Sequence, residues 1–436
     1  MPLSRLPVEI VSHITSHLPH HGVIFASLVC KAWRLVLLPT LYRMVRLASD
    51  SHAVRFANTI ASGGVVDSSL DFSWSVRSLI IRPTISAYNE FTEIGLAALE
   101  LCMTHLTELR RLHCDNLRVL LTANNLEIIR LAQTRCPKLN SVGFDIERFN
   151  FETRIAEQSQ LATFSLLGFK NLVDYSLILR DAYTKSEILA PLEILAANCP
   201  MLESLMLDLS FSESDEEDSY TPEHLAGVLG KDTVMPSLRT LHICGDVKLN
   251  PESFTILQPF HKFLSCHPHI KDLKIGWSIT DSWWRASDLD PQALACALPS
   301  LKRLSAPNFV CAHFLRSTIA ARLEYMEVQS GISDFERGFE SLPMPMLRTL
   351  YIEADHYFDT LDTIQWVMPV ASGLEVLDLV ALPEHCHNKF LRLLACVPNL
   401  QTVVMTDLIH HTVQDLIAAV KSKYPKIRFV ENWHDA

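Results

Sequence analysis

The chain has 436 residues, of which 48% are hydrophobic and 20% are charged, and it contains 13 glycines. This composition excludes an intrinsically disordered chain, because enough apolar side chain is present to build a core. The formal net charge of −11 argues against non-specific nucleic-acid binding, and no run reaches the roughly 18 apolar residues of a membrane span.

Eleven cysteines are scattered along the chain without a C-x-x-C pair. Several of them, including Cys199, Cys296 and Cys396, lie on apolar stripes or in turns, so we expect buried, reduced thiols. The N-terminus shows no long apolar run of the kind that secretory leaders carry. We therefore expect an intracellular protein of the cytoplasm, the nucleus or both.

The first predicted element is a short helix that begins near Pro7. Proline suits the first turn of a helix, and Glu9 suits its positively charged end. Ile10, Ile14 and Leu18 recur every four residues, which gives this helix one apolar face.

Two further helices are predicted before residue 47. The second begins near Val23, because His20–Gly22 offer only Gly22 as an acceptable cap. The third runs through Trp33 until Pro39 stops it. Three helices of this size bury little surface alone, so they need a partner or the adjoining chain to support them.

Four pieces of this stretch together resemble the F-box. They read Leu6-Pro7-x-Glu9, Ile10/Ile14/Leu18, Ser27-Leu28-Val29-Cys30-Lys31-x-Trp33-Arg34 and Pro39-x-Leu41-Tyr42. The resemblance implies docking onto a Skp-family adaptor and, through it, onto a cullin-based ubiquitin ligase. The residues that it implies form or support the adaptor interface are Leu6, Pro7, Ile10, Ile14, Leu28, Val29, Cys30 and Trp33. The alternative is a small helical cap for a repeat array.

A connector follows the three helices. Residues 41–47 predict a strand, and residues 51–61 predict an amphipathic helix that Ser51 or Asp50 caps and Gly63-Gly64 ends. We therefore divide the chain into an F-box-like module at 1–47, a capping helix with its connector at 48–69, and a repeat region at 70–436.

The repeat region contains thirteen copies of one phrase: an apolar residue, two variable residues, an apolar residue, one variable residue and an apolar residue. The copies begin at Val76, Leu109, Leu139, Leu161, Leu202, Leu238, Ile270, Leu301, Leu323, Leu347, Leu374, Leu400 and Ile427. Their spacing of roughly 22 to 41 residues is typical of a stacked repeat array. The last three anchors alternate as a half-buried strand does, and a proline commonly precedes the phrase.

Helical stretches such as 189–198 and 389–396 lie upstream of these strands. One helix–turn–strand unit cannot bury its own apolar face, so neighbouring units must stack. Residues 70–432 resemble the leucine-rich-repeat family in an irregular form. The expected fold is an α/β solenoid, a horseshoe with a concave parallel sheet and helices outside, preceded by the three-helix module. This arrangement is similar to the large F-box families of mushroom-forming fungi.

Two segments between repeats carry unusual side chains. Residues 212–219 form an acidic run, for which we weigh a solvated loop against a phosphorylated one. Trp277, Trp283 and Trp284 lie in a long segment after a strand, where they either fill the repeat or bind a partner. Paired histidines at 267/269, 385/387 and 410/411 lack the spacing of a zinc ligand set.

Variable positions of the phrase should point to the concave face, because side chains alternate along a strand. We expect this face to bind the target protein through Lys274, Arg303, Tyr325, Glu327, Tyr351, Glu353 and Asp378.

No catalytic constellation, phosphate-binding loop or metal motif is present in the sequence. We therefore expect a non-catalytic protein without a cofactor: the substrate-recognition subunit of a Skp-adaptor, cullin-type ubiquitin ligase. Its partners would be the adaptor, the ligase core and an unidentified protein substrate, with no nucleic acid and no membrane. The alternative is a leucine-rich-repeat scaffold or inhibitor with no ligase role.

Overall fold

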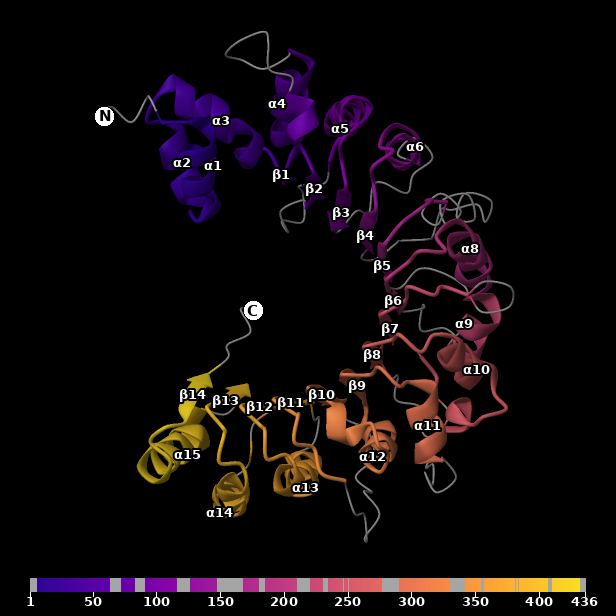
Figure 1. Cartoon of the computed structure of the whole chain (residues 1–436), viewed down its shortest axis with the longest axis vertical. Coiled ribbons are helices and arrows are strands. Elements are labelled where there is room, and N and C mark those ends of the chain that lie inside the picture. The colour runs from indigo at the N-terminus through magenta and orange to yellow at the C-terminus, as the bar shows by residue number, and fades with distance from the viewer. Residues whose placement is uncertain are drawn as a thin grey trace. The chain divides into compact units, whose positions relative to one another are not determined.

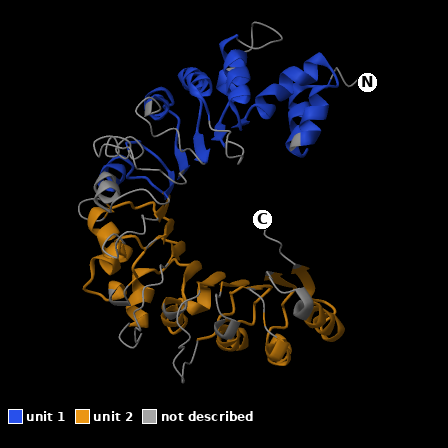
Figure 2. Ribbon diagram, turned by 180° about the vertical axis from the view of Figure 1, so that it is seen from behind, with its two compact units in different colours: residues 1–202, 211–213 blue, residues 203–210, 214–436 orange. Residues whose placement is uncertain are grey.

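The computed structural model of the chain describes residues 6–62, 72–82, 91–115, 126–146, 168–179, 185–209, 220–229, 234–245, 247–249, 251–276, 290–329, 342–353, 357–380, 382, 384–406 and 410–431. The chain divides into two compact units, which Figure 2 draws in separate colours. The first comprises residues 1–202 and 211–213, and the second comprises residues 203–210 and 214–436.

The first unit begins with a helical bundle and continues as alternating strands and helices (Figure 1). The bundle consists of α1 (Val8–Ser16), α2 (His20–Ser27) and α3 (Lys31–Leu41). The other elements are β1 (Met44–Leu47), α4 (Asp50–Ala61), η2 (Phe72–Ser75), β2 (Ser78–Ile81), α5 (Glu93–His105), β3 (Arg111–Asp115), α6 (Leu126–Arg135), β4 (Ser141–Ile146), β5 (Asp174–Leu179) and α8 (Lys185–Asn198). Strands β1 to β5 pair in parallel and in chain order.

The second unit repeats the same strand–helix alternation. Its strands are β6 (Ser204–Leu209), β7 (Thr240–Gly245), β8 (Asp272–Ile275), β9 (Arg303–Pro307), β10 (Tyr325–Gln329), β11 (Thr349–Glu353), β12 (Val376–Val380), β13 (Thr402–Thr406) and β14 (Arg428–Glu431). They also pair in parallel and in chain order.

Helices connect the strands of the second unit and lie on one side of them (Figure 1). They are α9 (Pro222–Leu229), η3 (Pro251–Phe254), α10 (Pro259–Cys266), α11 (Pro291–Ala297), α12 (Asn308–Leu315), η5 (Ala320–Arg322), α13 (Tyr357–Val367), η6 (Met368–Val370), α14 (Glu384–Leu393), η7 (Leu394–Cys396) and α15 (His410–Lys423).

Twelve of the thirteen predicted phrases coincide with a strand that begins one or two residues after the first anchor. The later anchors, such as Leu241 and Ile243 of β7, are buried under the helices, whereas the residue between them, His242, faces the other side. Burial of the anchors removes apolar surface from water, which stabilises each repeat against its neighbours. The predicted fold class, leucine-rich repeats with a parallel sheet after a helical module, is therefore confirmed.

One strand was not predicted. β5 follows a phrase that begins at Leu172, in which the aromatic Tyr175 occupies the middle apolar position and is 1% exposed. The sequence analysis placed this repeat at Leu161 instead, which lies outside the described residues. A buried tyrosine satisfies the apolar requirement through its ring, which a pattern that counts tyrosine as polar overlooks.

The bundle corrects two predicted helix ends. α2 begins at His20 rather than near Val23, after the extended Pro19 and without a side-chain cap. α3 continues through Pro39 and ends at Leu41, with the Tyr42 amide donating to the Leu38 carbonyl over 2.9 Å. A proline near the C-terminal end removes one amide donor of its helix, and the flanking bonds hold the last turn.

The connector contains the two predicted elements, β1 and α4. The cap of α4 is Ser49 rather than Ser51 or Asp50, because extended Ser49 directs its hydroxyl to the His52 amide. Asp50 instead accepts a hydrogen bond from the Thr92 amide over 3.0 Å, at the start of α5. Gly63 and Gly64 lie outside the described residues.

The cysteines are only partly as predicted. Cys199 is buried, and burial raises the pKa of its thiol. Cys296 and Cys396 are exposed, so the expectation of buried thiols was wrong for them: each lies on the outward side of its helical turn. Within the described ranges, no helix combines the length and the apolar composition needed to cross a membrane.

A buried histidine joins two repeats of the second unit. His267 is 2% exposed; its Nδ1 donates to the Phe263 carbonyl over 2.7 Å, and its Nε2 accepts from the Met235 amide over 3.1 Å. Both contacts are satisfied only by the neutral imidazole. Burial accordingly lowers the pKa of His267 below its ordinary 6.5.

We expect this histidine to make the second unit less stable in acid. The unfolded chain binds the proton at a higher pH than the folded chain, so the free energy of unfolding falls as the pH drops below 6.5. Thermal unfolding measured across this range should show the loss in the wild type and a flatter profile in His267→Gln. His269→Gln, at an exposed neighbour, is the control that should keep the wild-type profile.

Candidate functional site

The helical bundle α1–α3 is organised around a small core. Val11, Val23, Ala26, Trp33 and Leu37 are buried there. Leu6, Cys30, Val36 and Leu41 pack against this core and are partly buried. Cys30 is also the N-cap of α3, where its Sγ accepts from the Trp33 amide over 3.4 Å.

Large apolar side chains of the bundle also lie on its surface. Leu28 is 63% exposed and Phe25 is 68% exposed. The other exposed members are Val8, Ile10, Ile14, Leu18, Ile24 and Val29. This concentration of exposed aliphatic and aromatic surface on three short helices is characteristic of a protein-binding site.

The residues predicted to contact an adaptor fall into two groups. Pro7, Ile10, Ile14, Leu28 and Val29 are exposed and can contact a partner directly. Leu6, Cys30 and Trp33 belong to the core of the bundle or its margin. The sequence analysis did not include the exposed Phe25 and Ile24, because α2 has no clear apolar periodicity to mark an exposed face.

A second candidate site is the strand face opposite the helices in the second unit. The register aligns Asp272 with Arg303 and Tyr325 across β8, β9 and β10. The next row along the strands aligns Lys274 with Ser305, Glu327, Tyr351 and Asp378. Glu353 pairs with Gln329 in the third row. All seven residues predicted for target binding therefore share one face of five adjacent strands.

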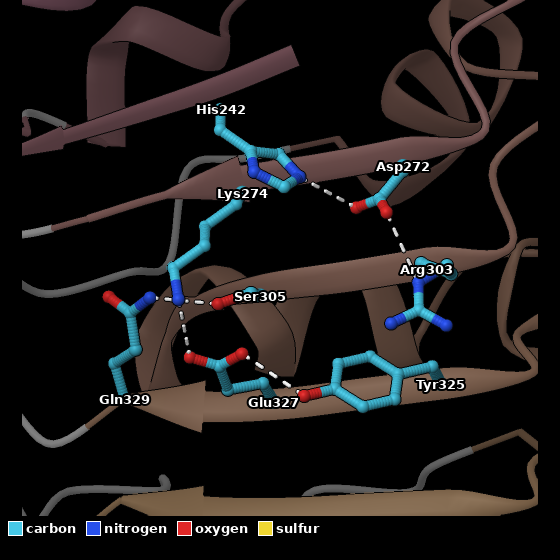
Figure 3. A network of polar contacts seen from close by, with 8 residues as sticks. All are labelled: His242, Asp272, Lys274, Arg303, Ser305, Tyr325, Glu327 and Gln329. Atoms are coloured by element: carbon cyan, nitrogen blue, oxygen red, sulfur yellow. Dashed lines mark hydrogen bonds and ion pairs between the residues drawn. The ribbon is translucent and has the colours of Figure 1, made fainter. Parts of the chain in front are cut away.

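Two chains of polar contacts connect these rows (Figure 3). In the first, Asp272 accepts from His242 Nε2 and from Arg303 Nε, each over 3.1 Å. The Arg303 guanidinium lies 4.3 Å from the centre of the Tyr325 ring, a cation–π contact. These four side chains, one on each of four adjacent strands, therefore each contact the side chain on the next strand.

The second chain of contacts is centred on Glu327, which is 9% exposed. Its Oε1 accepts from Lys274 Nζ over 3.0 Å, and its Oε2 accepts from the Tyr325 hydroxyl over 3.2 Å. Beside it, Gln329 Nε2 donates to Ser305 Oγ over 2.8 Å (Figure 3). The sequence analysis did not propose Ser305 and Gln329 for target binding, although strand alternation from Arg303 and Tyr325 would have placed both on this face.

The partners determine the ionisation of the face. Burial opposes the charge of Asp272, but the hydrogen bond from His242 and the positive charge of Arg303 outweigh burial and lower the pKa of Asp272. Burial likewise opposes the charge of Lys274, but the hydrogen bond to Glu327 and its negative charge raise the pKa of Lys274. These groups are therefore charged at neutral pH and form a fixed pattern of charge.

The two unusual segments between repeats contribute no described residue to the candidate sites. The acidic run 212–219 and Trp277, Trp283 and Trp284 lie outside the described residues. In the part of the chain that the structure describes, His, Cys, Asp and Glu side chains form no group of three that could hold a metal ion.

Comparison with known proteins identifies the N-terminal bundle. Residues 3–48 match the family model described as F-box-like. A search of curated proteins found no match. Among solved structures, the chain is similar to one in the crystal structure of the Rad7 and Elc1 complex in yeast, with 14% identity over 99% of this chain and 98% of that chain. The TM-score is 0.43.

Proposed function

We propose that this F-box protein is the substrate-recognition subunit of a cullin-type ubiquitin ligase, in which the bundle α1–α3 docks a Skp-family adaptor and the repeats hold a target protein. The observation that carries the proposal is the exposed apolar surface of the bundle, within the segment that matches the F-box-like family. Such surface is unfavourable in water and is stabilised by a bound partner.

The same surface argues against a bundle that only caps the repeats. A cap presents polar side chains to solvent, since its purpose is to end the apolar core. Ile10 and Ile14 instead leave 46% and 40% of their surface exposed, on a helix whose core residues are Val11 and Thr15. α1 therefore has apolar side chains in excess of those that its own fold buries.

The strand face supports the second half of the proposal. Arg303, Tyr325 and the carboxylates of Asp272 and Glu327 are held by neighbouring side chains of this face, and such pre-organised groups lose little conformational freedom when a partner binds. The chain would act by position alone. A target held there would present its lysines to the ubiquitin carrier at a raised effective concentration, without a catalytic residue on this chain.

The proposal is tested by co-purification of the full chain with a Skp-family adaptor and its cullin. We expect the wild type to capture both and Ile14→Glu to lose them, because a buried unpaired carboxylate at an apolar interface weakens binding by several kcal/mol, about 2–5. Ser12→Glu adds the same charge at an exposed position of the same helix and should bind as the wild type does. Absence of adaptor from the wild-type preparation would favour a scaffold without a ligase role.

A further inference from the structure

Arginines are concentrated on the first three strands of the first unit. Residues 43–47, 77–82 and 108–115, which form β1–β3 and the ends beside them, contain six arginines, no lysine and two carboxylates. The arginines are Arg43, Arg46, Arg77, Arg82, Arg110 and Arg111. Since the whole chain has a net charge of −11, this local excess of positive charge is opposite to the charge of the protein as a whole.

Backbone hydrogen bonds place three of these arginines side by side in one row. The Arg43 carbonyl accepts from the Arg77 amide over 2.9 Å, and the Arg77 carbonyl accepts from the Arg110 amide over 2.9 Å. In the next row, the register aligns Ser78 of β2 with Arg111 of β3. Because neighbouring strands lie about 4.8 Å apart, the long side chains of both rows reach a common region at this end of the strands.

Few of these positive charges are neutralised. Arg77 pairs with Glu108, which also pairs with Lys138. Arg82 pairs with Asp115 over 3.2 Å. Within the described residues, the other four guanidinium groups make no ion pair or hydrogen bond; they belong to Arg43, Arg46, Arg110 and Arg111.

At the same end of the strands in the second unit, cations are paired across neighbouring repeats. Lys302 Nζ lies 2.6 Å from Glu324 Oε1, and Arg348 pairs with Glu375. The corresponding row of the first unit consists of three arginines on adjacent strands. Like charges on neighbouring strands repel each other, so an anion bound between them would stabilise this row.

A buried hydroxyl without a partner lies beside these arginines. Ser78 is 8% exposed, and its Oγ has no hydrogen-bond partner among the described residues. Alternation along β2 directs Ser78 away from the core residue Leu79 and onto the same face as Arg111. Its neighbours in the row, Met44 and Arg111, have long, exposed side chains whose rotamers change readily and can uncover the hydroxyl. An oxyanion would then accept a hydrogen bond that Ser78 otherwise does not make.

We propose that Arg43, Ser78, Arg110 and Arg111 bind a phosphate group. A phosphate ester carries nearly two negative charges at neutral pH and offers three strong acceptor oxygens, which suits several guanidinium groups and one hydroxyl. A carboxylate, with one charge and two oxygens, would use fewer of these donors. Arginine binds phosphate through two parallel N–H donors, whereas lysine acts as a point charge, so the exclusive use of arginine favours the same ligand. The site belongs to the first unit, whereas the proposed target-binding residues belong to the second.

The test uses the full chain and fluorescent peptides that carry phosphoserine, glutamate or serine between Gly-Ser flanks. Fluorescence anisotropy at moderate salt should show binding in the order phosphoserine, glutamate, serine. Inorganic phosphate should displace the phosphoserine peptide, whereas sodium chloride at the same ionic strength should not. Displacement near the dissociation constant of the peptide indicates a site for free phosphate. A requirement for about tenfold more phosphate indicates a phosphorylated protein segment as the ligand.

Arg110→Gln combined with Arg111→Gln should weaken binding of the phosphoserine peptide about tenfold. Arg239→Gln combined with Lys271→Gln is the matched control. It removes two positive charges from exposed positions in the corresponding row before β7 and β8, and should leave the affinity unchanged. Ser78→Ala should weaken binding about threefold, because it removes one neutral hydrogen bond. It should not lower the thermal midpoint, since the hydroxyl has no partner to lose.

Each outcome decides the inference. Equal affinity for the phosphoserine and serine peptides, or equal losses in the two charge-removing variants, would overturn it. Wild-type affinity in Ser78→Ala would overturn the site as described, because the hydroxyl would then take no part in binding. Equal binding of a single-stranded oligonucleotide and the phosphoserine peptide would show a general attraction for polyanions instead. Adaptor capture measured on the same preparations separates the two proposals: intact capture with no phosphoserine preference rejects only the phosphate site.

Discussion

Replacement of Trp33 by alanine is expected to unfold the bundle α1–α3 while the second unit stays folded. Trp33 is 8% exposed and packs with Val11, Val23, Ala26 and Leu37, so its truncation should cost about 3–5 kcal/mol. A bundle this small has little stability in reserve. Hydrogen exchange should become fast in α1–α3 and remain slow in β6–β14, and adaptor capture should be lost.

Phe25→Ala is the matched control for this loss. Phe25 is another aromatic residue of the bundle, but it is 68% exposed and contributes little to the core. Its removal should leave hydrogen exchange in α1–α3 as in the wild type. Wild-type protection in Trp33→Ala would contradict the core described for the bundle.

Replacement of Gly245 by alanine is expected to destabilise the second unit by about 2–4 kcal/mol. Gly245 ends β7 with a backbone φ of +90°, a conformation that residues other than glycine rarely adopt. An added Cβ would also overlap the backbone of Leu209, its partner on β6. The two strands would have to separate there, which a lower midpoint in urea unfolding should report.

Gly227 offers a control of opposite sign within the same unit. It lies in α9, and an added Cβ would meet no atom within 4 Å. Gly227→Ala should therefore stabilise the helix by about 0.5–1 kcal/mol. If both substitutions shifted the unfolding midpoint equally, the strained conformation of Gly245 would be refuted as the cause.

The strands were predictable from sequence because each repeat needs the same buried positions. Leu238, Leu241 and Ile243 are apolar because they are buried under the helices, and the repeated sequence phrase reflects these buried positions. Tyr175 broke the pattern because its ring is buried while its chemical class is polar. The prediction that Pro39 ends α3 was wrong for a different reason. The missing amide of Pro39 removes only one backbone hydrogen bond, and neighbouring ones, such as that from the Tyr42 amide to the Leu38 carbonyl, keep the helix intact.

The candidate sites were predictable only in part. Ile14 and Trp33 are both apolar members of the F-box pattern, and sequence alone does not separate the exposed side chain from the buried one. The alternation of side chains along a strand placed Tyr325 and Glu327 on the strand face opposite the helices. Their contact partners, however, depend on the register between neighbouring strands. Lys274 meets Glu327 across two strand intervals because β8, β9 and β10 align as they do.

The junction between the bundle and the first strand has a mechanical consequence. α3 ends at Leu41, and only Tyr42 and Arg43 precede β1. The Arg43 carbonyl accepts from the Arg77 and Ser78 amides over 2.9 and 3.0 Å, which ties this short link to the next strand. A partner that orients the bundle would therefore orient β1–β5 with it, because the link is short and hydrogen-bonded and does not act as a flexible tether. The rotational entropy of aligning the bundle with β1–β5 is therefore lost when the chain folds and is not lost again when a partner binds the bundle.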